Sequence, residues 1–149
     1  MTPDLQPLRI VEPFPLADLP RLWVWMEQFK HQIFDDFGPL NQDEFVDLYM
    51  ERLGGGDRTF AVYRGDVIGG FVSITAPDPC GVAESHCVFR KEFFGHQTTV
   101  PALKEVFGIV FADGVSKLAT AIFSDNHAVA GLAKALGFQL EGTARKVRM

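Results

Sequence analysis

The spacing of hydrophobic residues changes period twice along this chain of 149 residues, and that change limits the folds open to it. Between Leu19 and Leu53 apolar side chains recur every three or four residues, which is typical of amphipathic helices. From Thr59 to Phe89 β-branched and aromatic residues dominate, as they do in strands. Helical spacing returns after Gly95. The pattern, with no linker long enough to divide it, predicts one mixed α/β domain.

Local signals give the order of the elements. Asp18 is expected to cap the first helix, and Asn41 with Glu44 three residues later resembles a capping box at the start of the second. Arg64-Gly65-Asp66 reads as the tight turn of a hairpin. The predicted order is strand 8–14, helices 19–33 and 41–53, an antiparallel meander of strands 59–63, 67–74 and 82–89, helix 95–112, strand 117–123, helix 126–136, and a last strand pair 138–141 and 143–147.

Composition argues against several classes of protein. The formal net charge of −5 disfavours a nucleic-acid surface, which needs a basic face. No apolar run reaches the roughly 18 residues that a membrane helix needs, and residues 1–10 do not resemble a signal peptide. Cys80 and Cys87 are too few for a disulfide scaffold, and no Cys/His cluster has the spacing of a zinc site. We therefore expect a cytoplasmic protein without a metal.

The segment after the third meander strand has the character of an anion site. The strand ends near Phe89, and a loop from Arg90 to Gln97 leads into a helix whose first N–H groups and dipole favour a negative charge. Gly95 allows the backbone to approach a ligand closely. Arg90, Lys91, His96 and Gln97 can add charge or hydrogen bonds. A pyrophosphate is the ligand that this arrangement favours.

The segment from Ala121 to Arg145 carries the most specific pattern in the chain. A strand is followed by Asp125-Asn126, a helix, the tripeptide at 136–138 that reads Leu-Gly-Phe, and then Glu-Gly-x-x-Arg ending at Arg145. This pattern resembles the closing segment of the GNAT acetyltransferases, most closely the branch that acetylates ribosomal-protein N-termini. The hairpin Gly65 to Gly70 also resembles that family's entry into its third strand.

The resemblance implies one GNAT-type domain over residues 1–149, an antiparallel meander followed by β-α-β-α, with acetyl-CoA as co-substrate. In that fold the pantetheine arm lies between two splayed strands and pairs with the backbone near Phe89, because its amides need hydrogen-bond partners once buried. Asn126 would contact the arm. The cofactor-binding residues expected on these grounds are Val88, Phe89, Arg90, Gly95, His96, Gln97, Thr98 and Asn126.

The chain departs from the family pattern at four positions. Phe94 precedes Gly95 where the family has a basic residue or Gln, and Gln97 replaces the second glycine of the loop. Ala133 stands where many members carry the Tyr that protonates the leaving thiolate, and Val129 where the ribosomal branch often has Ser. Slower chemistry, a water acting as acid, another residue in that role and a lost activity all stay open.

Transfer to an amine requires a base that removes the amine's proton. Glu84 and His86 alternate on the third meander strand, so both side chains point to one face. Either one is the expected base, and the structural alternatives are a solvated carboxylate and a partly buried, hydrogen-bonded histidine. Cys87 points to the other face and is expected in the core. The hypothesis is an N-acetyltransferase acting by direct attack on the thioester; the alternative is a catalytically silent protein of this fold that binds CoA or a protein partner.

The identity of the acceptor amine does not follow from the sequence. A peptide N-terminus, a lysine, a polyamine and another small amine are all consistent with it. His31, Asp35 and Asp36 lie at the end of the first helix, where family members line the acceptor entrance, but a solvated helix end is the favoured explanation. The short last strand, with its basic run Arg145 to Arg148, leaves a sheet edge that could pair with a second subunit to form a homodimer.

Overall fold

The computed structural model describes residues 7–29, 39, 41–93, 98–120, 131 and 134–138. The described elements are β1 (Leu8–Val11), η2 (Leu16–Asp18), α1 (Leu19–Met26), η3 (Glu27–Phe29), α3 (Gln42–Gly54), β2 (Arg58–Arg64), β3 (Val67–Ile74), β4 (Val82–Phe89), η4 (Lys91–Phe93), α4 (Thr99–Ala112) and β5 (Lys117–Ala119).

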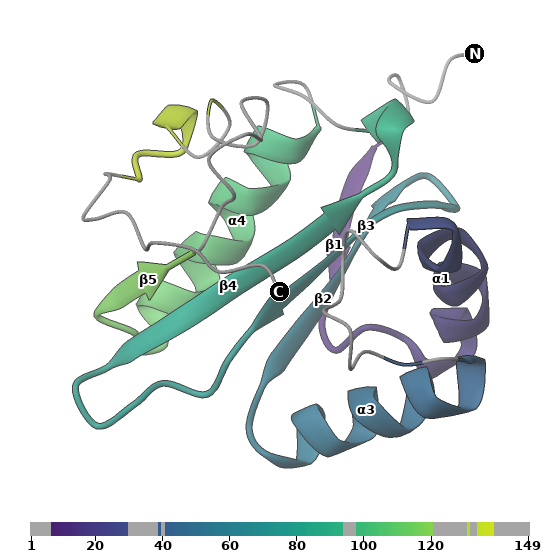
Figure 1. The fold of residues 1–149 in the computed structure, drawn as a ribbon. Helices are drawn as coiled ribbons and strands as arrows, with labels where there is room; N and C mark the ends of the chain where they lie inside the picture. Colours follow the sequence, from purple (N-terminus) through teal and green to yellow (C-terminus); the bar gives the residue numbers. More distant parts are fainter. Residues whose placement is uncertain are drawn as a thin grey trace.

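The five described strands form one mixed sheet in the order β1-β2-β3-β4-β5 (Figure 1). Neighbouring strands from β1 to β4 run antiparallel, whereas β5 joins β4 in parallel after the crossover through α4. The predicted mixed α/β fold, with a meander followed by strand-helix-strand, is therefore confirmed. The helix predicted from 126 and the last strand pair, with its edge for a second subunit, lie almost wholly outside the described residues.

The sheet separates two hydrophobic clusters, because side chains alternate between its faces. On β2, Phe60 and Val62 pack with α4, while Ala61 and Tyr63 pack with α1 and α3. Figure 1 shows the same arrangement, with α4 covering one face of the sheet and the pair α1 and α3 covering the other. The strands β2 and β3 are thus buried on both faces along part of their length.

The helix starts follow one prediction and contradict another. The Asn41 Oδ1 atom accepts a hydrogen bond of 2.9 Å from the Glu44 N–H, so the predicted cap of α3 is confirmed. The prediction that Asp18 caps α1 is wrong, since its side chain makes no capping bond. Its carboxylate instead accepts bonds of 2.6 Å from the Tyr63 hydroxyl and from Arg21. These bonds, the Tyr63 bond foremost, lower the pKa of Asp18.

Arg58 joins three separate parts of the chain. Its guanidinium donates to both carboxylate oxygens of Glu12, at 2.6 and 2.7 Å, and to Asp113 at 2.7 Å. Glu12 follows β1, Arg58 begins β2, and Asp113 ends α4. These bonds, the Glu12 bond foremost, raise the pKa of Arg58, and bidentate geometry makes such a pair stronger than an ordinary surface ion pair.

Replacing Arg58 by Met is expected to lower the free energy of unfolding by about 1–3 kcal/mol, because three charge-assisted hydrogen bonds are lost together. Urea unfolding followed by circular dichroism measures the change. Arg21→Met is the matched control: that side chain is 61% exposed and, among the described residues, is paired with Asp18 three residues away, so its loss should cost no more than about 0.5 kcal/mol. Equal losses in the two variants would show that Arg58 is an ordinary surface group.

Candidate active site

In the described part of the chain, the two parallel strands β4 and β5 pair over three residues. Their register runs through Val82↔Lys117, Ala83↔Leu118 and Glu84↔Ala119. One residue further on, the Thr120 hydroxyl donates to the Ser85 carbonyl at 3.2 Å, so a side chain takes the place of the next ladder bond. Beyond that contact, the described part of the chain contains no further pair between the two strands.

The direction of the β4 backbone follows from its bonds to β3. The Glu84 carbonyl accepts from the Thr75 N–H at 2.9 Å, and the Arg90 N–H donates to the Gly69 carbonyl at 2.8 Å. Even-numbered residues of β4 therefore direct their backbone groups toward β3, and odd-numbered residues direct theirs toward the β5 side. The N–H and C=O groups of Cys87 and Phe89 lie on that side, where no described strand meets them. Such an edge can hydrogen-bond an extended ligand that carries amides.

Glu84 and His86 lie together on the face of the sheet that α1 and α3 cover, as the alternation predicted. The His86 Nε2 atom is 3.5 Å from a Glu84 carboxylate oxygen, and their side chains are 59% and 64% exposed. The alternative of a partly buried histidine is therefore excluded for His86. The pair is accessible to an incoming amine and contains two groups able to accept its proton.

The next three predicted residues differ in what their side chains contact. Val88 packs toward the cluster under α1 and α3, and Phe89 packs toward the cluster under α4. The Arg90 side chain, 3.9 Å from Glu92, lines a pocket of about 140 Å³ together with Arg21 and other residues of α1 and β3. The side chains of Val88 and Phe89 thus belong to the core, and a ligand beside them would meet their backbone.

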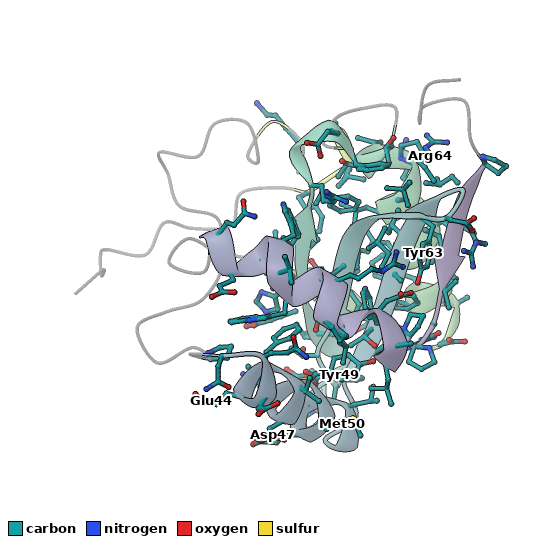
Figure 2. All side chains as sticks on the ribbon, turned by 90° about the vertical axis from the view of Figure 1, so that its right-hand side faces the viewer. Glu44, Asp47, Tyr49, Met50, Tyr63 and Arg64 are labelled. Carbon is teal, nitrogen blue, oxygen red and sulfur yellow. The ribbon has the colours of Figure 1, made fainter. Side chains whose placement is uncertain are left out.

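The side chains of Thr98 and Thr99 anchor the start of α4 through hydrogen bonds. Thr98, which precedes the helix and is 3% exposed, accepts a hydrogen bond of 3.2 Å from the guanidinium of Arg64. The buried Thr99 hydroxyl donates to the Phe93 carbonyl at 2.9 Å. Figure 2 shows Arg64 beyond Tyr63 at the end of β2. The sequence had placed Arg64 in a turn, and no local signal connects it with a residue 34 positions away.

Several predicted site residues cannot be placed by this structure. Gly95, His96, Gln97 and Asn126 lie outside the described residues, as do the departures at Phe94, Val129 and Ala133. The acceptor-side candidates His31, Asp35 and Asp36 lie outside them as well. Of the predicted loop and helix start, the structure describes Arg90 to Phe93 and the chain from Thr98 onward.

The environment of Cys87 is different from the one expected. The prediction that this residue lies in the core is wrong, because the structure places it among the exposed residues. The protein around the thiol nevertheless desolvates it and raises the pKa of Cys87 to about 11. At neutral pH this thiol is protonated, which agrees with the expectation that it is no nucleophile.

The described ranges contain neither a metal cluster nor a membrane-spanning helix. No group of three or more His, Cys, Asp and Glu side chains there is arranged to hold a metal ion. None of the helices described is both long enough and apolar enough to cross a bilayer.

Comparison with known families gives one match. A family model described as an acetyltransferase (GNAT) domain matches residues 9–139. A search of curated protein sequences finds no significant match.

Solved structures of the same fold exist at low sequence identity. A spermidine N-acetyltransferase from Vibrio cholerae, in complex with CoA and spermine, has a TM-score of 0.78 and 17% identity, over 91% of this chain and 82% of its own. An acetyltransferase from Salmonella typhimurium that modifies the N-terminal serine of ribosomal protein L7/L12 has a TM-score of 0.77 and 16% identity, over 95% and 85%. A putative acetyltransferase from the same organism, with its cofactor acetyl-CoA, has 0.70 and 17%, over 91% and 80%.

The raised pKa of Cys87 predicts slow reaction with thiol reagents despite its exposure. At pH 8 a thiol of pKa about 11 is ionised in only about one molecule per thousand, and the thiolate is the reactive form. The variant Cys80→Ser, which keeps Cys87, should react with a maleimide at least about tenfold more slowly than Cys87→Ser, which keeps Cys80. Its rate should keep rising as the pH approaches 11. A rate for Cys87 that levels off below pH 9 would contradict the assignment.

Proposed function

Because this chain belongs to the GNAT family of acetyltransferases, we propose that it transfers the acetyl group of acetyl-CoA to a primary amine by direct attack on the thioester. The observation that carries this proposal is the short pairing of β4 with β5, which leaves the backbone of Cys87 and Phe89 facing the β5 side with no described strand against it. Acetyl-CoA supplies an activated acyl group, and the residues of the chain supply binding, orientation and proton removal.

The residues present fit the cofactor in length and in chemistry. From Ser85, the last β4 residue with a described contact to the β5 segment, to Phe89 the strand rises about 13 Å, and it carries backbone donors and acceptors on the β5 side. These groups suit the two amides of the pantetheine arm, with Val88, Phe89 and Arg90 beside it, and Asn126 is proposed to contact the arm as well. The start of α4 follows, where Gly95, His96, Gln97 and Thr98 are proposed to hold the pyrophosphate.

Glu84 or His86 is proposed to remove the proton of the attacking amine. Both side chains are exposed. Glu84 is in the last described pair between β4 and β5, and His86 lies two residues further along β4. A ligand whose phosphates rest on the start of α4 and whose arm follows β4 must direct its acyl end toward this point. The amine can then approach from the face that α1 and α3 cover.

The acceptor is proposed to be either a small polyamine or a peptide N-terminus. Two of the structural neighbours carry these names, one a spermidine acetyltransferase and the other an enzyme acting on a ribosomal protein, so the two acceptor classes define the first arms of a screen. The cytoplasm is the proposed location, in keeping with two cysteines that are both free.

Calorimetric titration with CoA, followed by release of free thiol from acetyl-CoA in the presence of an amine panel, tests the function. Binding together with amine-dependent thiol release supports the proposal. Binding without release on any amine favours the catalytically silent alternative. Absence of binding at millimolar CoA would overturn both.

Substitution of the two candidate bases separates them. Glu84→Gln or His86→Gln is expected to lower kcat by about 10²–10⁴-fold, whichever residue accepts the proton, with little change in the KM for acetyl-CoA. The other variant should lose much less, because its role is limited to the 3.5 Å contact with its neighbour. Glu51→Gln on the exposed side of α3 is the control and should leave kcat unchanged. If neither variant loses tenfold in kcat, the base lies elsewhere.

A further inference from the structure

Two consecutive glycines in β3 mark a place where the backbone is approached closely. Val62 of β2 pairs with Gly70, and the next residue, Tyr63, pairs with Ile68, so Gly69 is the extra residue of a β-bulge. Glycine inside a strand ordinarily weakens it and often indicates that another group must come near. Each of these glycines faces an aromatic ring. Gly70 faces the ring of Phe89 at the end of β4, and Gly69 faces the ring of Phe93, which follows β4 in η4.

The ring of Phe93 occupies the space where a side chain at Gly69 would lie. A Cβ atom added at Gly69 would be 2.6, 2.7 and 2.9 Å from three carbons of that ring, closer than real Cβ contacts occur. Phe93 is 4% exposed, so its ring has little room to retreat. Two backbone bonds of 2.8 Å complete the contact, from the Arg90 N–H to the Gly69 carbonyl and from the Phe93 N–H to the Arg90 carbonyl. The turn η4 is thereby seated on the bulge.

The same phenylalanine is also bound to the start of α4. Its carbonyl accepts the hydrogen bond of 2.9 Å from the Thr99 hydroxyl, and Thr99 has no exposed surface. Thr98 beside it accepts the bond from Arg64. Phe93 therefore connects two elements: its ring rests on the β3 bulge, and its carbonyl holds the first turn of α4.

We propose that Gly69 is a positioning residue for the coenzyme: by leaving room for the Phe93 ring, it sets where the first turn of α4 presents its N–H groups to the phosphates. This inference rests on the proposed function, since it concerns the same phosphate site. Gly69 itself touches no phosphate and acts only through Phe93 and Thr99.

The physical basis is that hydrogen bonds from backbone N–H groups to an anion depend steeply on position. A helix start that is fixed before the ligand arrives loses no free energy in becoming ordered on binding. A displacement of about 1 Å at a site of this kind can cost about a hundredfold. An added Cβ at Gly69 must displace the Phe93 ring, or the bulge, by a few tenths of an ångström to one ångström before normal contact returns.

Gly69→Ala is expected to raise the Kd of CoA, measured by calorimetry, by about tenfold or more. The KM for acetyl-CoA should rise by a similar factor while kcat stays within about twofold, because the candidate bases Glu84 and His86 are untouched. Gly108→Ala on α4 is the matched control, since a Cβ there meets no atom within 4 Å and CoA affinity should not change. General destabilisation would instead alter kcat and both KM values together.

A double-mutant cycle tests the route through the ring. If Gly69 acts only by accommodating Phe93, the substitution Gly69→Ala should have little further effect on CoA affinity in a Phe93→Ala background. Thr99→Val provides a second approach that leaves β3 intact: loss of its hydroxyl bond to the Phe93 carbonyl should also weaken CoA binding, even if Gly69→Ala proves too unstable to purify.

Three outcomes are distinguishable. Weaker CoA binding in Gly69→Ala and Thr99→Val, with the effect of Gly69→Ala lost in the Phe93→Ala background, supports the inference. Wild-type affinity in either variant, or an equal effect of Gly69→Ala with and without the ring, overturns it and leaves the proposed function intact. A wild-type protein that does not bind CoA overturns the proposed function itself, and the inference with it.

Discussion

The unequal pairing of β4 on its two edges is the constraint on which the rest of this structure depends. On one edge β3 pairs with it from Gly70↔Phe89 to Ile74↔Ser85, and on the other edge β5 pairs with it over three residues. Backbone groups of a central strand that no described strand meets are available to water or a ligand. The longer described pairing of β4 is with β3, and it is at this supporting strand that the two glycines and two phenylalanines interlock.

The same asymmetry orders the chemistry along β4. The end near Glu84 and His86 is where the strands are still joined, and the end near Phe89 leads through η4 to the start of α4. One strand can thus hold an extended ligand whose phosphates lie near the start of α4 and whose acyl group lies near Glu84 and His86. Its two faces divide the remaining tasks, since odd-numbered residues pack toward α4 and even-numbered residues face the side of α1 and α3.

Local sequence signals predicted the parts of this fold that depend on neighbours in the chain. The capping box at Asn41, the hairpin turn around Gly65 and the common face of Glu84 and His86 all follow from residues a few positions apart. The two predictions that were wrong, for Asp18 and Cys87, depend on the surroundings of these residues in the folded chain. Asp18 does not cap its helix because Tyr63, 45 positions away, binds its carboxylate, and Cys87 is exposed although alternation directs it to the α4 face. The Gly69-Gly70 pair was visible in the sequence, but only the positions of Phe93 and Phe89 explain it.

The two arginines that begin and end β2 have a joint consequence for α4. Arg58 bonds to Asp113 at one end of the helix and Arg64 to Thr98 at the other. Six strand steps from Arg58 to Arg64 span about 20 Å, and fifteen helical steps from Thr98 to Asp113 span about 22 Å, so strand and helix are matched in length. The distance between the two arginines on β2 therefore fits the length of α4. A relative in which α4 is one helical turn longer or shorter would lose one of the two arginine bonds. The length of β2 therefore limits the length of α4.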